Sequence, residues 1–447
     1  MLVNADLNNS AKISLWLAIL ININVVIGGA FFITAPKIGK IAGSYAPIAW
    51  LVGALLLSPV FIIFAQLARK FPHAGGIYIY SREAFGALVG FITGWTYFIG
   101  NSAGNALFID AFTEASLNIP LISNFANYFG ITKLGFNLSI ILILILTSLG
   151  SSKLLANAQV FISWLKFIPF CIVFIGVLTN SRISNLAAIE PSPSWASEIL
   201  PIILFSYIGI EACSSIAHTI QDGSKNVARV TYISFFLVTA IYALSHLGLI
   251  LSMGAGSATE DVFARLAWIV GNNFGPKFAT ILYNIVIFSM GFSYIGGAFS
   301  LINTDCWLLY SMTADFNNPI KNFFIKLNKH GQPINCILIQ GLLATILLIY
   351  AQNQDWMTCA SVVGVVFAFF ATALAYIKLF KQKHFFILST LALFSITIMG
   401  IVVLQDFLTR GIMNALPMLL IFALGFCIFF TDRFFKNNEF SLCKINK

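Results

Sequence analysis

Two adjacent glycines, Gly28 and Gly29, interrupt the first long apolar run of the chain, which covers residues 13–35. Each glycine costs a helix about 1 kcal/mol relative to alanine, so the helix is expected to open here. Inside a bilayer the freed backbone groups need partners in the protein or in a wet cavity, and free amide N–H groups can hold an anion. The pair therefore predicts a small-molecule site at mid-membrane depth. The alternative is that the glycines only let a neighbouring helix approach.

A second polar interruption lies in the run 198–220, where the sequence reads Ile208-Gly209-Ile210-Glu211. Glu211 is expected to be the only carboxylate deep in a span, and ionisable residues there are rare and usually functional. It can take up a proton, close an inner gate by hydrogen bonding or sense a cationic substrate. The alternative is a structural hydrogen bond to an unwound helix.

The two interruptions together suit an α-amino acid, which carries a carboxylate and an ammonium group. Free N–H groups at Ile27, Gly28 and Gly29 would hold the carboxylate, and unpaired carbonyls near Phe205 and Ile208 would hold the ammonium. Opposed helix half-dipoles reinforce both contacts.

Lys166 lies near the middle of the run 156–178. A lysine at the centre of a span costs about 2.5–3.5 kcal/mol on insertion scales. The alternative is snorkelling, but the ends of the span are too far for a good reach to a headgroup. An amine in such an interior can release and rebind a proton, so Lys166 is predicted to be a reversible proton carrier.

The amino-acid composition indicates the class of protein in which these residues lie. Of the 447 residues, 59% are hydrophobic and only 9% are charged, and the mean hydropathy is +0.90. These values indicate an all-α polytopic membrane protein and exclude a soluble globular protein. The apolar runs do not alternate as barrel strands do. The first run is too long for a cleavable signal peptide, so none is expected.

The apolar runs predict twelve transmembrane helices, at 13–35, 45–68, 88–112, 136–150, 156–178, 198–220, 230–253, 279–311, 333–350, 357–380, 386–404 and 411–430. With the N-terminus inside, 17 of the 25 Lys and Arg residues fall on the cytoplasmic side and 7 on the other, with Lys166 in a span. This bias predicts that both termini are cytoplasmic.

The two interrupted runs are the first and the sixth, and an offset of five spans reverses the direction through the membrane. The chain is therefore predicted to contain a first inverted repeat over 1–180 (helices 1–5) and a second over 181–384 (helices 6–10). Residues 385–447 would supply helices 11 and 12 and a cytoplasmic tail. Substrate in such transporters lies between the two breaks.

Several motifs make the comparison with known families specific. Residues 71–86 read F-P-H-A-G-G-I-Y-I-Y-S-R-E-A-F-G, residues 309–315 read L-Y-S-M-T-A-D and residues 205–211 read F-S-Y-I-G-I-E. These segments resemble signatures of the amino acid–polyamine–organocation (APC) superfamily of permeases, over helices 1–10. The resemblance implies a LeuT-like fold with broken helices 1 and 6. The first break departs from the family pattern G-[SA]-G-[IV]-F, which leaves the particular substrate open.

The resemblance also implies roles for individual residues. Phe205 corresponds to an aromatic gate over substrate, with a lipid-facing ring as the alternative. Asn101 matches an asparagine of arginine/agmatine antiporters and would either line the pocket or bridge helices. In proton-coupled members a span-5 lysine stands where sodium-coupled relatives bind their cation, so Lys166 would face span-1 carbonyls and a hydroxyl of Ser289 or Ser293. The glutamate matching Glu211 is tied to acid-dependent transport.

We therefore expect a secondary active amino-acid permease that works by alternating access, with substrate-binding residues Ile27, Gly28, Gly29, Asn101, Phe205, Ile208 and Gly209. Proton symport through Lys166 and Glu211 is the leading mechanism. An amino acid/amine antiporter is the alternative within the fold, and a membrane nutrient sensor or an integral membrane enzyme are alternatives of another class. No His/Asp or Ser/His cluster supports an enzyme, and no P-loop supports ATP drive.

The expected partners are a small-molecule amino acid, protons and the lipid bilayer of the cell (inner or plasma) membrane. No nucleic acid is expected, because the basic residues are scattered. No cofactor or metal is expected, because the seven cysteines show no ligand spacing and lie mostly in apolar runs.

Overall fold

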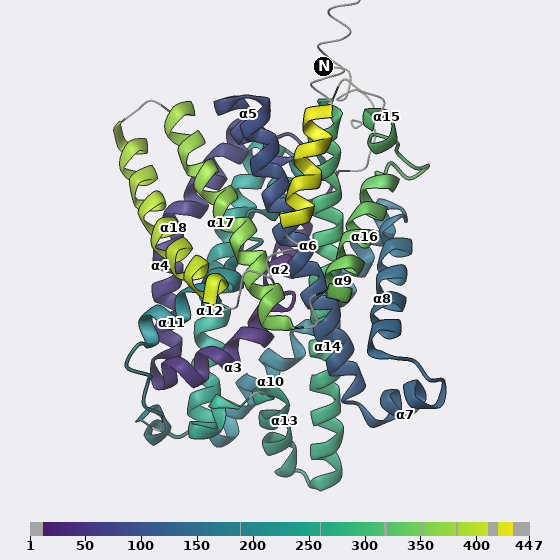
Figure 1. The fold of residues 1–447 in the computed structure, drawn as a ribbon. Coiled ribbons are helices and arrows are strands. Elements are labelled where there is room, and N and C mark those ends of the chain that lie inside the picture. The colour runs from purple at the N-terminus through teal and green to yellow at the C-terminus, as the bar shows by residue number, and fades with distance from the viewer. Residues whose placement is uncertain are drawn as a thin grey trace, which may run out of the picture.

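The computed structural model describes residues 12–187, 189–259, 261–316, 320–350, 353–380, 383–409 and 419–431. Over these residues the chain is helical, and two isolated bridges are the only β-structure among them. Figure 1 shows the helices gathered in one bundle, with α5 and α15 at one end and α7 and α13 at the other. We call these the α5 end and the α7 end.

The first half of the chain builds the helices α2 (Leu15–Ile27), α3 (Ala30–Ala42), α4 (Ala46–Lys70), α5 (Gly76–Phe85), α6 (Ala87–Leu117), α7 (Pro120–Tyr128), α8 (Lys133–Ser148), α9 (Ser152–Lys166) and α10 (Ile168–Asn180). The second half builds α11 (Trp195–Tyr207), α12 (Gly223–Met253), α13 (Val262–Asn272), α14 (Pro276–Ala314), α15 (Ile320–Phe324), α16 (Ile334–Tyr350), α17 (Gln354–Leu379) and α18 (Lys383–Thr409). A further apolar helix covers Leu419–Thr431.

Local signals explain where several helices begin and end. Ser14 and Thr132 cap α2 and α8, because each hydroxyl accepts a hydrogen bond from a backbone N–H three residues on. Pro169 stands in the first turn of α10, where its missing N–H costs nothing, and this explains why α9 ends at Lys166 and a new helix starts after Phe167.

Seven helices in the described part of the chain are long and apolar enough to cross a membrane, or eight if the bent pair α7–α8 is one span. The described residues also contain shorter apolar helices, at Leu15–Ile27, Val262–Asn272, Ile334–Tyr350 and Leu419–Thr431. Three of these overlap the predicted spans 13–35, 333–350 and 411–430 and account for part of the difference from twelve, because the break shortens the first span. Val262–Asn272 lies in none of the predicted spans. The start of the twelfth, 411–418, lies outside the described residues. The chain is a multi-pass helical membrane protein.

Two helices form the centre of the arrangement that positions the site. α6 packs against both α14 and α17, and α14 also contacts α2 and α9. α12 packs on α4 and contacts α2, so the broken first span is enclosed by α9, α12 and α14. The buried core is continuous across these helices.

Candidate functional site

The first span opens where the glycines predict. α2 ends at Ile27 and α3 begins at Ala30, which leaves Gly28 and Gly29 outside regular helix. Gly29 has φ −140° and ψ −23°, and both glycines are buried. The opening is confined to this pair, so it is a sharp break and not a long unwound loop.

Both glycines are also points of contact with other helices, as the alternative interpretation expects. A β-carbon on Gly28 would collide with the Cα atom of Gly297 in α14. A β-carbon on Gly29 would lie 2.5 Å from a ring atom of Phe108 and 2.8 Å from one of Tyr294. Gly28 therefore faces backbone, which cannot yield, whereas Gly29 faces two aromatic side chains, which can rotate. The pair opens the helix and also permits close packing.

Carbonyl groups at the end of α2 find donors on two other helices. The Tyr242 hydroxyl of α12 donates to Val26 O at 3.3 Å, and the Ser293 hydroxyl of α14 donates to Ile27 O at 3.3 Å. The last carbonyls of a helix lack intrahelical partners, and unsatisfied groups are costly in lipid. The Tyr242 hydroxyl also lies 3.1 Å from Ser206 O in α11. One hydroxyl is therefore shared between the two broken spans.

Lys166 is fully buried and contacts the first span. Its Nζ atom donates to Asn24 O at 3.3 Å, and its exposed fraction is 0%. Snorkelling is therefore excluded, and the predicted contact with a span-1 carbonyl is present. The predicted contact with a span-8 hydroxyl is absent from the described hydrogen bonds, because Ser289 donates to Leu165 O and Ser293 to a carbonyl of α2. Both serines bond backbone carbonyls instead of the ammonium.

Polar residues that the sequence analysis did not select join α9 to α2 and α14. The Asn24 amide donates to Gln159 Oε1 and to Ser163 Oγ, each at 2.8 Å. The Gln159 amide donates to Ser300 Oγ of α14 at 2.8 Å. An asparagine inside the first apolar run was the available signal for this network. Lys166 thus lies at one end of a buried polar seam between three helices.

The second break lies between α11, which ends at Tyr207, and the 3-10 turn that follows Glu211. Gly209 has φ +104°, a conformation that favours glycine, and a β-carbon there would meet the Val25 side chain of α2. The Glu211 carboxylate accepts the Tyr97 hydroxyl at 2.6 Å and the Gly209 N–H at 3.2 Å. Glu211 therefore makes the structural hydrogen bond to the unwound segment that was its alternative role.

Asn22 of α2 supports the second break from outside. Its Nδ2 atom donates to Ile210 O at 2.9 Å, and its Oδ1 atom accepts Cys213 N–H at 3.3 Å. One buried amide thus satisfies an acceptor and a donor that the break leaves without helical partners. Asn22 was not among the predicted site residues, although an amide in an apolar run is a visible signal.

Phe205 is 3% exposed, so the alternative of a lipid-facing ring is wrong. Its ring centroid lies 6.3 Å from that of Phe108, the ring that covers Gly29. Phe108 thus covers the first break, and Phe205 packs beside Phe108. The Phe205 carbonyl, which was expected to be unpaired, accepts the Ile208 N–H at 3.2 Å. The short turn at the end of α11 causes this, because it closes a backbone hydrogen bond across the start of the break.

Asn101 bridges helices, one of its two expected roles. Its Nδ2 atom donates to Asp305 Oδ1 of α14 at 2.8 Å. Asp305 is 1% exposed, so the expectation that Glu211 is the only carboxylate deep in a span is wrong. Asp305 lies near the end of the predicted run 279–311, but α14 continues to Ala314 and places it inside the protein. Its position in an apolar run was the signal that could have found it.

A cavity of about 550 Å³ lies near the α7 end between α3, α6, α13 and α14. Lys37 and Lys40 of α3 line it together with two carboxylates, Glu114 and Asp261. Its lining also includes Tyr294, the ring that covers Gly29. The cavity therefore carries both signs of charge and reaches the aromatic cover of the first break.

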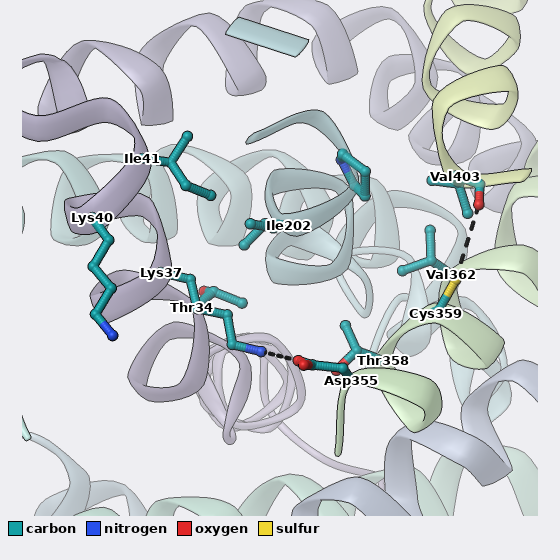
Figure 2. Close-up of a pocket in the computed structure, with 11 residues that line it drawn as sticks. Thr34, Lys37, Lys40, Ile41, Ile202, Asp355, Thr358, Cys359, Val362 and Val403 are labelled. Carbon is teal, nitrogen blue, oxygen red and sulfur yellow. Dashed lines mark hydrogen bonds and ion pairs between the residues drawn. The ribbon is translucent and has the colours of Figure 1, made fainter. Parts of the chain in front are cut away.

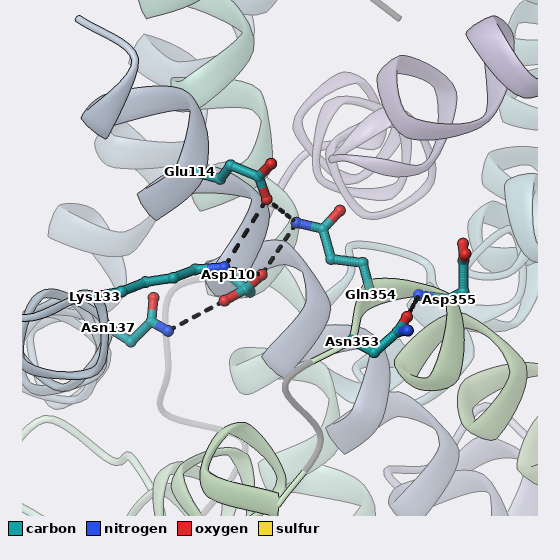
Figure 3. A network of polar contacts seen from close by, with 7 residues as sticks. All are labelled: Asp110, Glu114, Lys133, Asn137, Asn353, Gln354 and Asp355. Atoms are coloured by element: carbon teal, nitrogen blue, oxygen red, sulfur yellow. Dashed lines mark hydrogen bonds and ion pairs between the residues drawn. The ribbon is translucent and has the colours of Figure 1, made fainter.

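Polar contacts hold the walls around this cavity. Figure 2 shows Lys37 pointing across a neighbouring pocket of about 330 Å³ to Asp355, at 2.5 Å. Figure 3 shows Asp110 of α6 accepting hydrogen bonds from Lys133 and Gln354, each at 3.0 Å. Exposed ion pairs contribute about 0–1 kcal/mol each. Their main consequence is to connect α3 and α6 to α8 and α17.

At the α5 end, residues of the motif 71–86 form hydrogen bonds to neighbouring elements. Arg82 and Tyr78 of α5 both donate to the Asp315 carboxylate at the end of α14. Burial, and then the Asp315 charge, raise the pKa of Tyr78 above its ordinary value, so the hydroxyl remains a donor. Gly75 N–H donates to Ser215 O at 3.2 Å. These contacts tie α5 to α14 and to the segment after the second break.

With this geometry described, comparison with known proteins assigns the family. A sequence model of the family described as amino acid permease matches residues 13–442, nearly the whole chain. The chain belongs to the amino acid permease family. The relatives named here are transporters, and none is an enzyme.

Three relatives illustrate the range of the family. The chain is 22% identical to an aspartate-proton symporter of Bacillus subtilis (strain 168), over 72% of this chain and 64% of that protein. It is 23% identical to the glutamate/serine transporter AimA of the same strain, over 80% and 68%. It is 24% identical to an arginine/agmatine antiporter of Chlamydia abortus, over 81% and 77%. The match with uncharacterized transporters of Legionella pneumophila and Mycobacterium tuberculosis spans 63% and 62% of their length.

Proposed function

We propose that this chain is a secondary active amino-acid transporter of the LeuT-like fold. Twelve spans would form a 5+5 inverted repeat followed by two helices, in the cell membrane with both termini cytoplasmic. The observation that carries the proposal is the direct apposition of two broken helices, with Gly209 against Val25 and one Tyr242 hydroxyl shared between them. Helix breaks that face each other at membrane depth form substrate sites in transporters.

The substrate would lie between these breaks. Its carboxylate would approach the backbone at Ile27, Gly28 and Gly29, where the positive end of α3 begins. Its ammonium would approach Ile208 and Gly209, at the negative end of α11. Phe108 and Phe205 would cover the bound amino acid, and Phe108 must first move because its ring now fills the space beside Gly29.

Alternating access would use the difference between the two ends of the bundle. The mixed-charge cavity at the α7 end is suited to collect a zwitterion, with Lys37 and Lys40 near its carboxylate and Glu114 near its ammonium. The contacts of Asp315 with α5 close the α5 end and would break when the substrate leaves on that side. Only one end is open at a time in such a cycle.

Proton coupling would act through Lys166. The charged amine braces the Asn24 carbonyl near the end of α2. A neutral amine bonds this carbonyl more weakly, and α2 could then shift relative to α9. Loss or gain of one proton would change the equilibrium between the two conformations, and the same free energy couples proton binding to substrate binding.

An amine exchanger of the same fold is the second candidate, because the named relatives include both a proton symporter and an antiporter. Proteoliposomes containing the purified chain separate the two. Accumulation of a radiolabelled amino acid driven by an inward proton gradient supports symport. Uptake that requires an amino acid or amine inside the vesicle supports exchange. Accumulation driven by sodium alone would contradict the role of Lys166.

A further inference from the structure

Asp305 is a buried carboxylate whose hydrogen-bond donors are neutral. Asn101 Nδ2 donates to its Oδ1 atom at 2.8 Å, and Gln340 Nε2 donates to its Oδ2 atom at 3.1 Å. Gln340 is held in turn by the Ser102 hydroxyl, at 2.9 Å from its Oε1 atom. No ion pair to Asp305 occurs among the described residues. A buried carboxylate requires a counter-charge or a proton.

The titratable side chains around Asp305 supply no cation. Those that face it are Tyr97 from α6, Glu211 from the second break and Cys306 from α14. His218 packs on the ring of Trp307, the second residue beyond Asp305, with 4.6 Å between ring centroids. Tyr97, Glu211 and Cys306 are neutral or anionic, so none of them can serve as a counter-ion, and a proton is the simplest way to neutralise Asp305.

The Asn101 amide provides independent geometric support. Its Oδ1 atom is buried and has no donor in the described structure, which is unfavourable for a polar atom. The two ends of an amide occupy nearly the same space, so the group can present either its N–H or its C=O to Asp305. If Asp305 carries a proton and the amide turns over, the Asp305 O–H donates to this orphan oxygen.

The turned amide would also connect Asp305 to Glu211. Asn101 lies beside the Tyr97 hydroxyl, one helical turn away on α6, so its freed Nδ2 can donate to the Tyr97 oxygen. The Tyr97 hydroxyl already donates to Glu211 Oε1 at 2.6 Å. Every group between the two carboxylates then has a partner, with all donors pointing from Asp305 toward Glu211.

We propose that Asp305 is a proton-binding site that shares one proton with Glu211 through Asn101 and Tyr97. With the proton on Asp305, the relay points toward an ionised Glu211. With the proton on Glu211, its O–H donates to the Tyr97 oxygen, and the Tyr97 hydroxyl turns to donate to Asn101 Oδ1. The Asn101 amide then donates to an ionised Asp305, with its Nδ2 atom placed as observed. Turning the amide reverses the hydrogen bonds but carries no proton, so one carboxylate loses its proton to water while the other gains one from water, and the pair keeps one proton. This inference rests on the proposed function only for its role in transport.

The position of the pair suggests when the proton leaves. Asp305 follows Gly297, the contact of Gly28, by eight residues of α14, which is about 12 Å toward the α5 end. Asp305 therefore lies between the substrate breaks and the end that α5 closes, while Glu211 lies at the second break itself. Water entering when that end opens would stabilise both carboxylates in the ionised form, so proton release would accompany opening.

Infrared difference spectroscopy on the purified full-length chain tests the site without any transport. During alkaline titration we expect the carbonyl band of buried carboxylic acid to disappear in the wild type. In Asp305→Asn the band should lose its Asp305 component at every pH and retain only that of Glu211. Gln340→Leu removes a donor to the ionised form, so the band should persist to higher pH. Asp110→Asn, a buried carboxylate of α6 that has Lys133 as partner, should leave the band unchanged.

An unchanged band in Asp305→Asn would overturn the inference, whatever the transport result. If that variant does not fold, an unshifted midpoint in Gln340→Leu would overturn it equally. In proteoliposomes Asp305→Asn should change the pH profile of uptake, with transport retained at acid pH, where the carboxyl would be protonated. Failure of the wild type to transport amino acids would refute the proposed function while leaving the infrared result to decide on Asp305.

Discussion

The two broken spans satisfy their backbone in opposite ways. The first break depends on other helices, because Lys166, Tyr242 and Ser293 donate to carbonyls near the end of α2. The second break largely satisfies itself, because Glu211 accepts the N–H of Gly209 only two residues away. Asn22 is its main support from α2. Movement of α9, α12 or α14 must therefore disturb the first break directly.

Because of this difference, we expect the two breaks to respond to different changes in the protein. When the hydrogen-bond partners of a break lie on separate helices, movement of those helices changes the shape of the break. Such a break is suited to a conformational change linked to substrate binding. A break closed by its own carboxylate keeps its shape, and its response depends on the charge of that carboxylate. Substitutions at the first break should therefore alter binding and stability strongly, and those at the second should alter pH dependence with modest structural cost.

The largest expected effect is at Gly29. Leucine there would push into Phe108 and Tyr294, fill the space beside the break and abolish amino-acid binding, a loss of at least about 100-fold, or roughly 3 kcal/mol. The protein should remain folded because both neighbours are side chains that can move. Scintillation proximity binding with the purified variant measures this.

Gly28→Ala is the matched comparison, since its β-carbon meets the Gly297 backbone. Overpacking of this kind costs about 1–3 kcal/mol, so a lower thermal midpoint in detergent is expected than for Gly29→Ala. Normal affinity in Gly29→Leu for every transported amino acid would place the site elsewhere.

The next effect concerns Lys166 and the energy source. Lys166→Ala removes the brace on Asn24 and with it the proposed proton carrier, so proton-driven accumulation should be lost. Binding should change by less than about tenfold, or 1.4 kcal/mol, because the amine acts from behind α2 and not in the pocket. Uptake under an imposed proton gradient, compared with equilibrium binding at fixed pH, measures both. An unaltered proton response would leave Glu211 and Asp305 as the coupling groups.

Sequence and structure agree at residues that are chemically abnormal for a membrane span. Gly28, Gly29, Lys166 and Glu211 stand out in apolar runs, and each lies at or beside a helix break. Their partners could not be derived in the same way, because hydrogen bonds between distant spans depend on helix rotation. Nothing in the sequence distinguishes Tyr242 from other tyrosines, because its contact with both breaks depends on how α12 packs.

The errors have physical causes as well. Asp305 was overlooked because the predicted run ended six residues beyond it, and a carboxylate near an end can reach water. The continuous α14 extends further and buries it. The expectation of a free Phe205 carbonyl failed because a tight turn closes a hydrogen bond that spacing alone does not reveal. Helix length alone gives fewer spans than the twelve predicted, because each part of a broken helix is shorter than a helix that crosses a membrane.

A smaller effect is expected from Tyr242→Phe, which tests whether the two breaks are coupled. The ring can keep its buried packing against Phe31, at 4.5 Å between centroids, so the change isolates the hydroxyl. Val26 O and Ser206 O would each lose a donor, with a combined cost of about 1–3 kcal/mol. Thermal unfolding in detergent should show this loss. Tyr207→Phe is the control, because its hydroxyl donates to Trp50 O in α4 and its loss leaves the Tyr242 link between the breaks intact.

The smallest structural effect is expected from Glu211→Gln. Glutamine retains one oxygen that can accept the Tyr97 hydroxyl, and its N–H2 group replaces the oxygen that faces Gly209 N–H at 3.2 Å. We expect a stability loss near 1 kcal/mol, the net value of one neutral hydrogen bond. Glu211→Leu leaves both donors without an acceptor and should cost clearly more.

The pH dependence of substrate binding separates the two roles of Glu211. If the carboxylate takes part in proton coupling, binding to Glu211→Gln becomes less dependent on pH while Glu211→Leu is both less stable and less pH-dependent. If Glu211 only closes its own break, Glu211→Gln must bind substrate with the wild-type pH profile. The second break would then not respond to the charge of Glu211, and the proposed difference between the two breaks would no longer hold.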